Sequence, residues 1–278
     1  MVDREEFSIV SRDGTQLAGY EYLVPQPKAM VCMIHGLGEH AGRYEHVAQF
    51  FCEHNISFYI IDMRGHGLSE GKRGHAPTYE ALLDDVEELM MYARSEYNDL
   101  PMFLYGHSMG GNIVANYCLL RTTGELKGVV LSSPWFRLVA EPPTWKVNLA
   151  KRIATVLPSL TQPNNLNHQD LTHDKAVNQS YADDPMVHSK ISVKLFSQCY
   201  QHSKWALENS DRLKTPIFSF HGADDPIVNP LGTEAFAESR PDLVRFVSLA
   251  ETKHEPHNDL KQKEVLDLII GWIETRVS

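Results

Sequence analysis

The stretch GHSMG at 106–110 follows a strand-like apolar run at 102–105 and leads into a helical run. A serine on a sharp turn from strand to helix has its hydroxyl lifted clear of the sheet, and the residues two positions away must be small. Gly106 and Gly110 meet that need. The same five letters also suit a plain glycine-rich turn, but their context predicts a nucleophile elbow that carries Ser108.

A serine hydroxyl needs a base within hydrogen-bond reach, and the base needs a third group that orients it. After an elbow of this type the chain order is serine, then an acid, then histidine. Only His254 and His257 follow a plausible acid, and His254 comes soon after the strand-like run 245–249. We therefore expect His254 to be the base. His257 is expected in a solvated loop or on the rim of a substrate pocket.

The acid is expected at the end of another strand, and HGADDP at 221–226 follows such a run. Two adjacent aspartates compete for the role. Pro226 biases Asp225 toward extended backbone, whereas Asp224 can hydrogen-bond its own turn. This comparison favours Asp225 as the acid and keeps Asp224 as the alternative.

A tetrahedral intermediate also needs hydrogen-bond donors for its negative oxygen. One expected donor is the backbone amide of Met109, directly after the nucleophile. The other should come from the loop HGLGEH at 35–40, which follows an apolar run. We expect Leu37 to supply it, because the glycines on either side let the backbone turn its amide inward.

The chain resembles the monoacylglycerol lipase and lysophospholipase branch of the α/β-hydrolases over nearly its whole length. Five stretches carry the resemblance: HGLGEHAGRY at 35–44, DMRGHGLSEG at 62–71, GHSMGG at 106–111, HGADDPIV at 221–228 and KHEPHNDL at 253–260. The resemblance implies Asp225 as the acid and His254 as the base. It also implies that Arg43, Tyr181 and His257 lie around the polar head of the substrate. From the residues alone, Arg43 could instead pair with Glu39 at helical spacing, and Tyr181 could be a packed residue.

The resemblance implies a serine hydrolase, without cofactor or metal, that cleaves carboxylic esters with one acyl chain, first among them monoacylglycerols. A lysophospholipase and a general short-chain carboxylesterase stay open, because pocket length and head-group selectivity cannot be read here. An acyltransferase uses the same three residues. A non-catalytic binding protein of this fold would be expected to lack one of them. The histidines at 35, 40, 46 and 54 show no recognised zinc spacing.

Composition narrows the class of protein. The 278 residues, 42% of them hydrophobic, suit a single domain over 1–278. A net charge of -10 argues against a nucleic-acid partner, which demands a basic face. The start has no apolar signal region, and no run approaches the roughly 20 apolar residues of a membrane span. We expect a cytoplasmic protein, with peripheral contact at membranes as a further expectation. Its oligomeric state cannot be predicted.

Eight strand-like runs alternate with helices after the first two, which predicts a mostly parallel, eight-stranded α/β-hydrolase sheet covered by helices on both faces. The runs lie near 7–10, 16–22, 29–34, 57–61, 102–105, 128–132, 216–220 and 244–249. Between the sixth and seventh runs lies an insertion, about 136–210, without strand alternation. We expect it to form a helical cap over the active site.

One stretch of this insertion has apolar residues at helical spacing: Trp145, Leu149, Ile153, Val156, Leu157 and Leu160. Three basic residues are expected on the other side of the helix: Lys146, Lys151 and Arg152. Two interpretations fit. The helix packs on the body of the protein, or it is a lid whose apolar face meets lipid aggregates and guides an acyl chain, as the resemblance implies.

Overall fold

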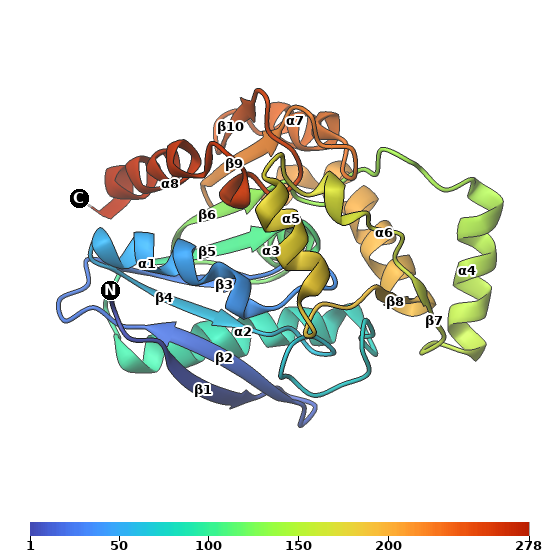
Figure 1. Cartoon of the computed structure of the whole chain (residues 1–278), viewed down its shortest axis with the longest axis horizontal. Helices are drawn as coiled ribbons and strands as arrows, with labels where there is room; N and C mark the ends of the chain where they lie inside the picture. Colours follow the sequence, from blue (N-terminus) through green and yellow to red (C-terminus); the bar gives the residue numbers. More distant parts are fainter. Residues whose placement is uncertain (278) are drawn as a thin grey trace.

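A computed structural model describes residues 1–277 and contains one eight-stranded sheet (Figure 1). The strand order is β1-β2-β4-β3-β5-β6-β9-β10, with β2 antiparallel to both neighbours and every later pair parallel. The predicted mostly parallel sheet is thus confirmed. Its strands are β1 (Glu5–Val10), β2 (Gln16–Tyr22), β3 (Ala29–Ile34), β4 (Ile56–Ile61), β5 (Met102–His107), β6 (Leu126–Ser132), β9 (Ile217–Gly222) and β10 (Val244–Leu249).

The central strands are buried along their whole length, because helices cover both faces of the sheet. On one face lie α1 (Glu45–Glu53) and α8 (Gln262–Val277), packed on their own apolar cluster. On the other face lie α2 (Tyr79–Glu96), α3 (Met109–Leu120) and α7 (Pro230–Ser239), with a second cluster. Strands buried on both sides read as continuous apolar runs, as β3, β4 and β5 do. These two clusters hold the strand ends in place.

The carboxyl ends of β3, β5, β9 and β10 meet at one edge of the sheet, because these strands run parallel. The loop after each of them carries one of the residues predicted from sequence to do chemistry. In open α/β sheets this edge is where ligands bind.

The insertion, residues 136–210, separates β6 from β9. It holds three helices, α4 (Thr144–Val156), α5 (Lys175–Asp183) and α6 (Val193–Glu208), and one short 3-10 helix, His168–Asp170. It also contains two short strands that its sequence did not indicate, since β7 (Thr161–Pro163) and β8 (Lys190–Ser192) pair antiparallel. Three residues are too few to show an alternating pattern. In Figure 1, α4 lies at the end of the molecule opposite the C-terminus.

Helix α4 packs on α6 with one side only. Val147 and Ala154 are buried, whereas the side chains of Trp145 and Val156 are 64% and 76% exposed. The three basic residues 146, 151 and 152 are exposed as well. The expectation that all three lie opposite the apolar stripe is wrong, because helical spacing places Arg152 beside Leu149 and Val156, and Lys146 lines the same cavity as Leu149. Among the described residues, none of the helices combines the length and apolar character needed to cross a membrane.

Candidate active site

Ser108 lies on the turn between β5 and α3 with φ of 52° and ψ of -114°, the left-handed region that side chains rarely adopt. The turn closes because Gly106 and Gly110 approach each other. A Cβ on Gly106 would lie 2.6 Å from the carbonyl oxygen of Gly110. The amide of Ser108 donates to the carbonyl of Ser132 at 2.9 Å, which ties the turn to β6. The turn therefore has the backbone geometry expected of a nucleophile elbow.

Three side chains from separate loops form one chain of hydrogen bonds. The hydroxyl of Ser108 donates to Nε2 of His254 at 2.8 Å. Nδ1 of His254 donates to Oδ2 of Asp225 at 2.7 Å. Asp225 follows β9 and His254 follows β10, and both side chains are buried. This arrangement can move a proton from the serine to an imidazole whose charge the carboxylate stabilises.

The charges in this chain of hydrogen bonds support that chemistry. Burial alone would lower the pKa of His254, but the charge and hydrogen bond of Asp225 outweigh it, so this pKa lies above the ordinary 6.5. Burial alone would raise the pKa of Asp225, but His254 and His221 outweigh it and this pKa falls well below its usual range. Asp225 is therefore ionised at neutral pH.

The structure distinguishes between the two adjacent aspartates. Oδ1 of Asp225 accepts the amides of Ile227 at 2.8 Å and Val228 at 3.0 Å, which leaves Oδ2 for the imidazole. Asp224 points elsewhere, and its Oδ2 lies 3.9 Å from Nε2 of His173. It is Asp225 that the structure brings to the histidine.

Sequence reasoning missed His221, the residue that completes the surroundings of Asp225. Its Nε2 donates to Oδ2 of Asp225 at 2.9 Å and to the carbonyl of Val228 at 3.1 Å. Its Nδ1 lies 2.7 Å from the hydroxyl of Thr233. Chain order set His221 aside as a base, because it precedes the acid. The available signal was a histidine at the end of a buried strand, four residues before the aspartate.

The two expected oxyanion donors belong to segments next to Ser108, because Met109 follows it in the chain and a Cβ on Gly36, beside Leu37, would lie 3.3 Å from the Cβ of Ser108. Met109 is the first residue of α3, so its amide has no acceptor within the helix. Leu37 and Ser108 line the same cavity. Beside Leu37, the amide of Gly36 donates to Oε1 of Glu39 at 2.5 Å, and Gly38 has φ of +83°. The glutamate therefore fixes the loop that holds Leu37, and sequence reasoning gave it no such part.

Arg43 contacts two buried carboxylates. Its Nη1 donates to Oε2 of Glu39 at 2.5 Å and to Oε1 of Glu255 at 2.8 Å, while Nη2 donates to Oε2 of Glu255 at 2.7 Å. The guanidinium also lies 4.6 Å above the ring of Tyr181. The pairing with Glu39 matches what helical spacing alone suggested. The bond to Glu255 joins loops more than two hundred residues apart, which no local pattern reveals.

His257 lies in the interior, with a relative exposure of 0%. Its ring stacks on Tyr44 with centroids 4.9 Å apart and meets His107 edge-on at 4.7 Å. Burial lowers the pKa of His257 to about 3. The expectation of a solvated or rim position is therefore wrong. Neither His257 nor Arg43 nor Tyr181 belongs to the cavity wall, so their expected contact with a substrate head group stays a prediction.

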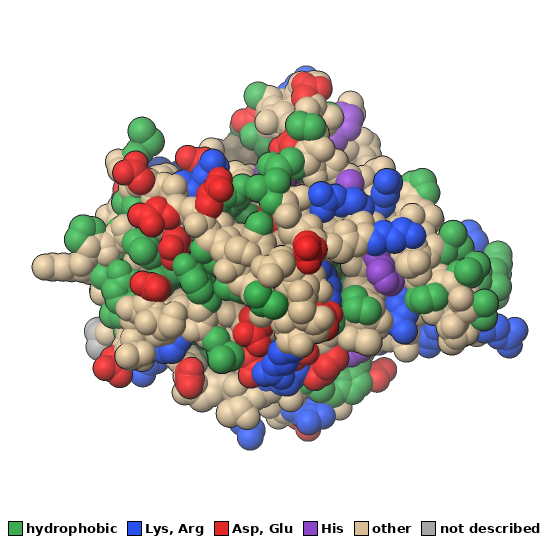
Figure 2. Space-filling model, turned by 90° about the horizontal axis from the view of Figure 1, so that it is seen from below, with side chains coloured by type: hydrophobic (Ala, Val, Ile, Leu, Met, Phe, Trp, Pro, Cys, Tyr) green, Lys and Arg blue, Asp and Glu red, His purple; other side chains and the backbone are tan. Residues whose placement is uncertain are grey.

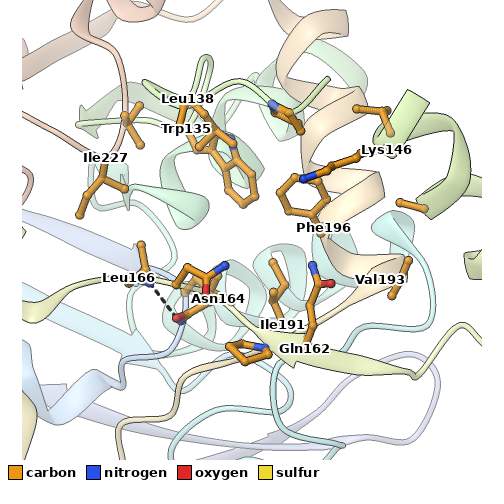
Figure 3. Close-up of a pocket in the computed structure, with 18 of the residues that line it drawn as sticks. Trp135, Leu138, Lys146, Gln162, Asn164, Leu166, Ile191, Val193, Phe196 and Ile227 are labelled. Carbon is orange, nitrogen blue, oxygen red and sulfur yellow. Dashed lines mark hydrogen bonds between the residues drawn. The ribbon is translucent and has the colours of Figure 1, made fainter. Parts of the chain in front are cut away.

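A cavity of about 740 Å³ opens at Ser108, within the size range of small-molecule sites. One wall is apolar and comes from the loop after β6 and from α6 (Figure 3), with Trp135, Leu138, Val193 and Phe196. The segment after α4 adds amide side chains, Gln162, Asn164, Asn165 and Asn167, together with the apolar Pro163 and Leu166. From α4 itself come Trp145, Leu149 and Ile153. Ser108 thus faces a space whose lining combines apolar side chains with uncharged amides.

Within the described residues, no group of three or more His, Cys, Asp or Glu side chains could hold a metal ion.

Comparisons with known proteins place the chain among hydrolases. Residues 25–261 match the family described as serine aminopeptidase, S33. An uncharacterized abhydrolase domain-containing protein of Dictyostelium discoideum is 34% identical over 91% of this chain, which spans only 27% of that protein. The monoacylglycerol lipase of Mycolicibacterium smegmatis is 31% identical over 97% of both chains. The crystal structure of Paleococcus ferrophilus monoacylglycerol lipase is 28% identical, with a TM-score of 0.82 over 99% of both chains. The resemblance and the α/β-hydrolase fold expected from sequence are confirmed.

Proposed function

Because the chain belongs to the serine aminopeptidase, S33 family and is a serine hydrolase of the α/β-hydrolase fold, we propose that it is a monoacylglycerol lipase. The proposed reaction is hydrolysis of a carboxylic ester that carries one acyl chain, with glycerol and a fatty acid as products. Its support comes from the geometry at Ser108 and from full-length relatives that bear this name.

In the proposed mechanism Ser108 Oγ attacks the ester carbonyl carbon while its proton passes to Nε2 of His254. Asp225 holds the imidazole in the required tautomer and stabilises its charge. The amides of Leu37 and Met109 donate to the oxygen that becomes negative. His254 then protonates the leaving glycerol oxygen, and an acyl-enzyme remains. A water molecule, deprotonated by His254, attacks the acyl carbon, and the serine regains its proton as the fatty acid leaves.

The single observation that carries the substrate proposal is the lining of the cavity at Ser108, which combines apolar side chains with uncharged amides. Its apolar side chains, among them Trp135 and Phe196, offer contact to an acyl chain, and burial of each methylene contributes about 0.8 kcal/mol. Its amide side chains offer uncharged hydrogen-bond partners to a hydroxylated head group. Among the lining residues only Lys146 and Asp170 carry a formal charge. A neutral glycerol ester suits this lining better than a charged lysophospholipid does.

The exposed apolar side of α4 supports a second part of this proposal, contact of the insertion with lipid aggregates. Trp145 and Leu149 are both exposed and both line the cavity. A substrate leaving an aggregate could therefore pass along α4 without entering bulk water. This continuity favours the lid interpretation over packing on the body, which involves the opposite side of the helix.

The decisive experiment compares monoacylglycerols, lysophospholipids and nitrophenyl esters of graded chain length on one enzyme preparation. The proposal expects the highest kcat/KM for a monoacylglycerol with a medium or long chain. Highest activity on a lysophospholipid, or on the shortest nitrophenyl esters, would support the alternatives instead. Product analysis with added alcohol separates hydrolysis from acyl transfer, since a transferase would yield a new ester in place of free fatty acid.

A further inference from the structure

Half of the fourteen histidines in this chain are buried. The seven are His35, His40, His66, His107, His221, His254 and His257. Figure 2 accordingly shows few histidine side chains on the face that it draws. A buried imidazole that lacks hydrogen-bond partners lowers the stability of the fold, so the partners of each one are informative. The mechanism proposed above uses His254, and His221 supports Asp225, but neither gives a part to His40.

His40 lies in the expected oxyanion loop, residues 35–40, and its two ring nitrogens face different parts of the protein. Nδ1 accepts the amide of Gly42 at 3.2 Å and so caps the short 3-10 helix that follows. Because Nδ1 is an acceptor, Nε2 carries the proton and donates to Oδ2 of Asp184 at 2.8 Å. Asp184 belongs to the insertion, directly after α5. One imidazole therefore connects the oxyanion loop with the insertion.

The other oxygen of Asp184 orders the turn that follows it. Oδ1 accepts the amide of Met186 at 2.8 Å, and the carbonyl of Asp184 accepts the amide of Val187 at 3.2 Å. This turn presents the amide of His188, which donates to the carbonyl of Gly38 at 2.8 Å. Gly38 directly follows the expected oxyanion donor in the chain. Asp184 therefore supports both of these hydrogen bonds between the insertion and the oxyanion loop.

The insertion also packs directly on the oxyanion loop. Gly38 has φ of +83°, and a Cβ there would lie 2.5 Å from the carbonyl oxygen of His188 and 3.2 Å from Nδ2 of Asn164. Only glycine fits at such a close approach. These contacts come from the segments around residues 164 and 184–188, and not from α4. The loop is thus held by the part of the insertion that lies against the body of the protein.

The bond between His40 and Asp184 is shielded from water. The side chain of His40 is 5% exposed and that of Asp184 is 23% exposed. Burial alone would raise the pKa of Asp184, but the hydrogen bonds from His40 and from the amide of Met186 outweigh it, so this pKa lies below its ordinary value. Asp184 is therefore ionised at neutral pH, and hydrogen bonds to an ionised acceptor are shorter and stronger than neutral ones.

We propose that Asp184 is a positioning residue for ester hydrolysis. Through His40 and the turn 185–188 it fixes the oxyanion loop, so that the amide of Leu37 points at the oxygen that becomes negative in the transition state. The insertion thereby acts on turnover itself and not only on the access of substrate. A preorganised donor needs no reorganisation during the reaction, so a loop without this support stabilises the transition state less. The inference rests on the proposed mechanism for the role of Leu37 and is independent of which ester is the natural substrate.

Two substitutions break this bond while they keep the turn on each side of it. Asp184→Asn retains Oδ1 for the turn that follows but places an amide group where His40 needs an acceptor. His40→Asn retains an acceptor for the amide of Gly42, since asparagine caps helices well, but it is too short to reach Asp184. The matched control is Asp183→Asn, which changes the neighbouring exposed carboxylate, a partner of a glutamine one turn earlier on α5.

The assay uses nitrophenyl butyrate, a soluble ester with a short chain, and expresses kcat per active site titrated with a fluorophosphonate. We expect Asp184→Asn and His40→Asn each to lower kcat at least about tenfold and to change KM less than about twofold, because loss of one oxyanion donor outright costs about 10²–10³ in kcat. Asp183→Asn should leave both constants unchanged. Unchanged kcat in the first two variants, or an equal loss in the control, would overturn the proposal.

A transition-state analogue separates positioning from a general loss of structure. The carbonyl carbon of a short alkyl trifluoromethyl ketone bonds to Oγ of Ser108, whose proton passes to His254, and the ketone oxygen becomes negative. Its inhibition constant should rise at least about tenfold in Asp184→Asn and His40→Asn, in step with the fall in kcat. An inhibition constant that stays at the parental value would show that the oxyanion loop is unaffected, and the proposal would fail.

The double variant, His40→Asn with Asp184→Asn, tests whether the two residues act through one bond. It should be no slower than the slower single variant, whereas losses that multiply would mean independent effects and overturn the proposal. If Asp184→Asn does not fold, His40→Asn decides alone. The parent enzyme separates this inference from the proposed function. Hydrolysis of the butyrate ester without hydrolysis of monoacylglycerol overturns only the proposed substrate, and hydrolysis of both with unaffected variants overturns only the role of Asp184.

Discussion

Arg43 forms two hydrogen bonds with Glu255, the residue directly after the histidine that contacts Ser108. The same guanidinium binds Glu39, whose other oxygen holds the amide of Gly36 beside Leu37. One buried cation therefore connects the expected oxyanion loop with the histidine loop. Burial alone would raise the pKa of Glu255, but Arg43 outweighs it and lowers this pKa to about 2.

This connection predicts a pH effect for Glu255→Gln. The Glu255 charge helps to raise the pKa of His254. The imidazole must be neutral to accept the serine proton, so activity falls as pH drops through that pKa. Removing the charge should therefore shift the acid limb of kcat/KM to lower pH. Glu251→Gln is the matched control, since Glu251 is exposed and pairs with Lys261. Coincident acid limbs in the variant and the parent would mean that Glu255 has a structural role only.

For the parent enzyme, the raised pKa of His254 places the midpoint of the acid limb above 6.5. The raised pKa of His254 also makes the stability of the fold depend on pH. A histidine whose folded pKa exceeds the unfolded one stabilises the fold fully below the unfolded pKa, and this contribution is lost as pH rises through the folded pKa. Kinetic titration of kcat/KM checks the midpoint. A midpoint well below 6.5 would contradict the assignment, as would an unchanged limb in an active His254→Gln variant.

Substitution of Ser108, the proposed nucleophile, tests the first step of the proposed mechanism. Ser108→Ala should lower kcat by about 10⁶, because the three side chains act as one unit and only pocket and oxyanion contacts remain. The fold should survive, so circular dichroism and melting temperature serve as controls. A variant that keeps a tenth of parental ester hydrolysis would remove Ser108 from the mechanism.

The adjacent aspartates provide a matched pair. Asp225→Asn should lower kcat by about 10⁴ by favouring the wrong histidine tautomer. Asp224→Asn removes the same charge one residue away, on a side chain near His173, and should lower kcat far less. Steady-state rates of both variants decide the assignment. Equal losses would leave it unsupported, and the reverse order would make it wrong.

The sequence was most informative where a pattern is local. The elbow needs two glycines around Ser108 within five residues, and chain order alone reduced fourteen histidines to two. Contacts between loops that are far apart in the chain are not indicated by any local sequence pattern. The bond from His221 to Asp225 depends on how a turn closes, and that from Arg43 to Glu255 on which strand ends are neighbours. The burial of His257 depends on rings from two other elements, which no sequence window contains.

The last prediction concerns Leu149 and Ile153, which line the cavity from α4. If they contact the acyl chain, replacing both with serine removes contact worth roughly 1.5 to 3 kcal/mol per side chain that the substrate buries fully. The value of kcat/KM for a long-chain monoacylglycerol should drop at least about tenfold, since that factor corresponds to 1.36 kcal/mol. Hydrolysis of a soluble acetate or butyrate ester should change little, because short esters do not reach α4.

A matched control replaces Leu231 and Leu260 with serine, two exposed leucines outside the insertion. It removes similar apolar surface and should leave both kinds of substrate unaffected. The melting temperature of each variant separates binding from folding. The side of α4 that packs on α6 contains Val147 and Ala154, so serine at 149 and 153 should lower the melting temperature only slightly. A large fall in melting temperature, together with equal losses of kcat/KM on short and long esters, would show that these residues pack against the protein and do not guide the substrate.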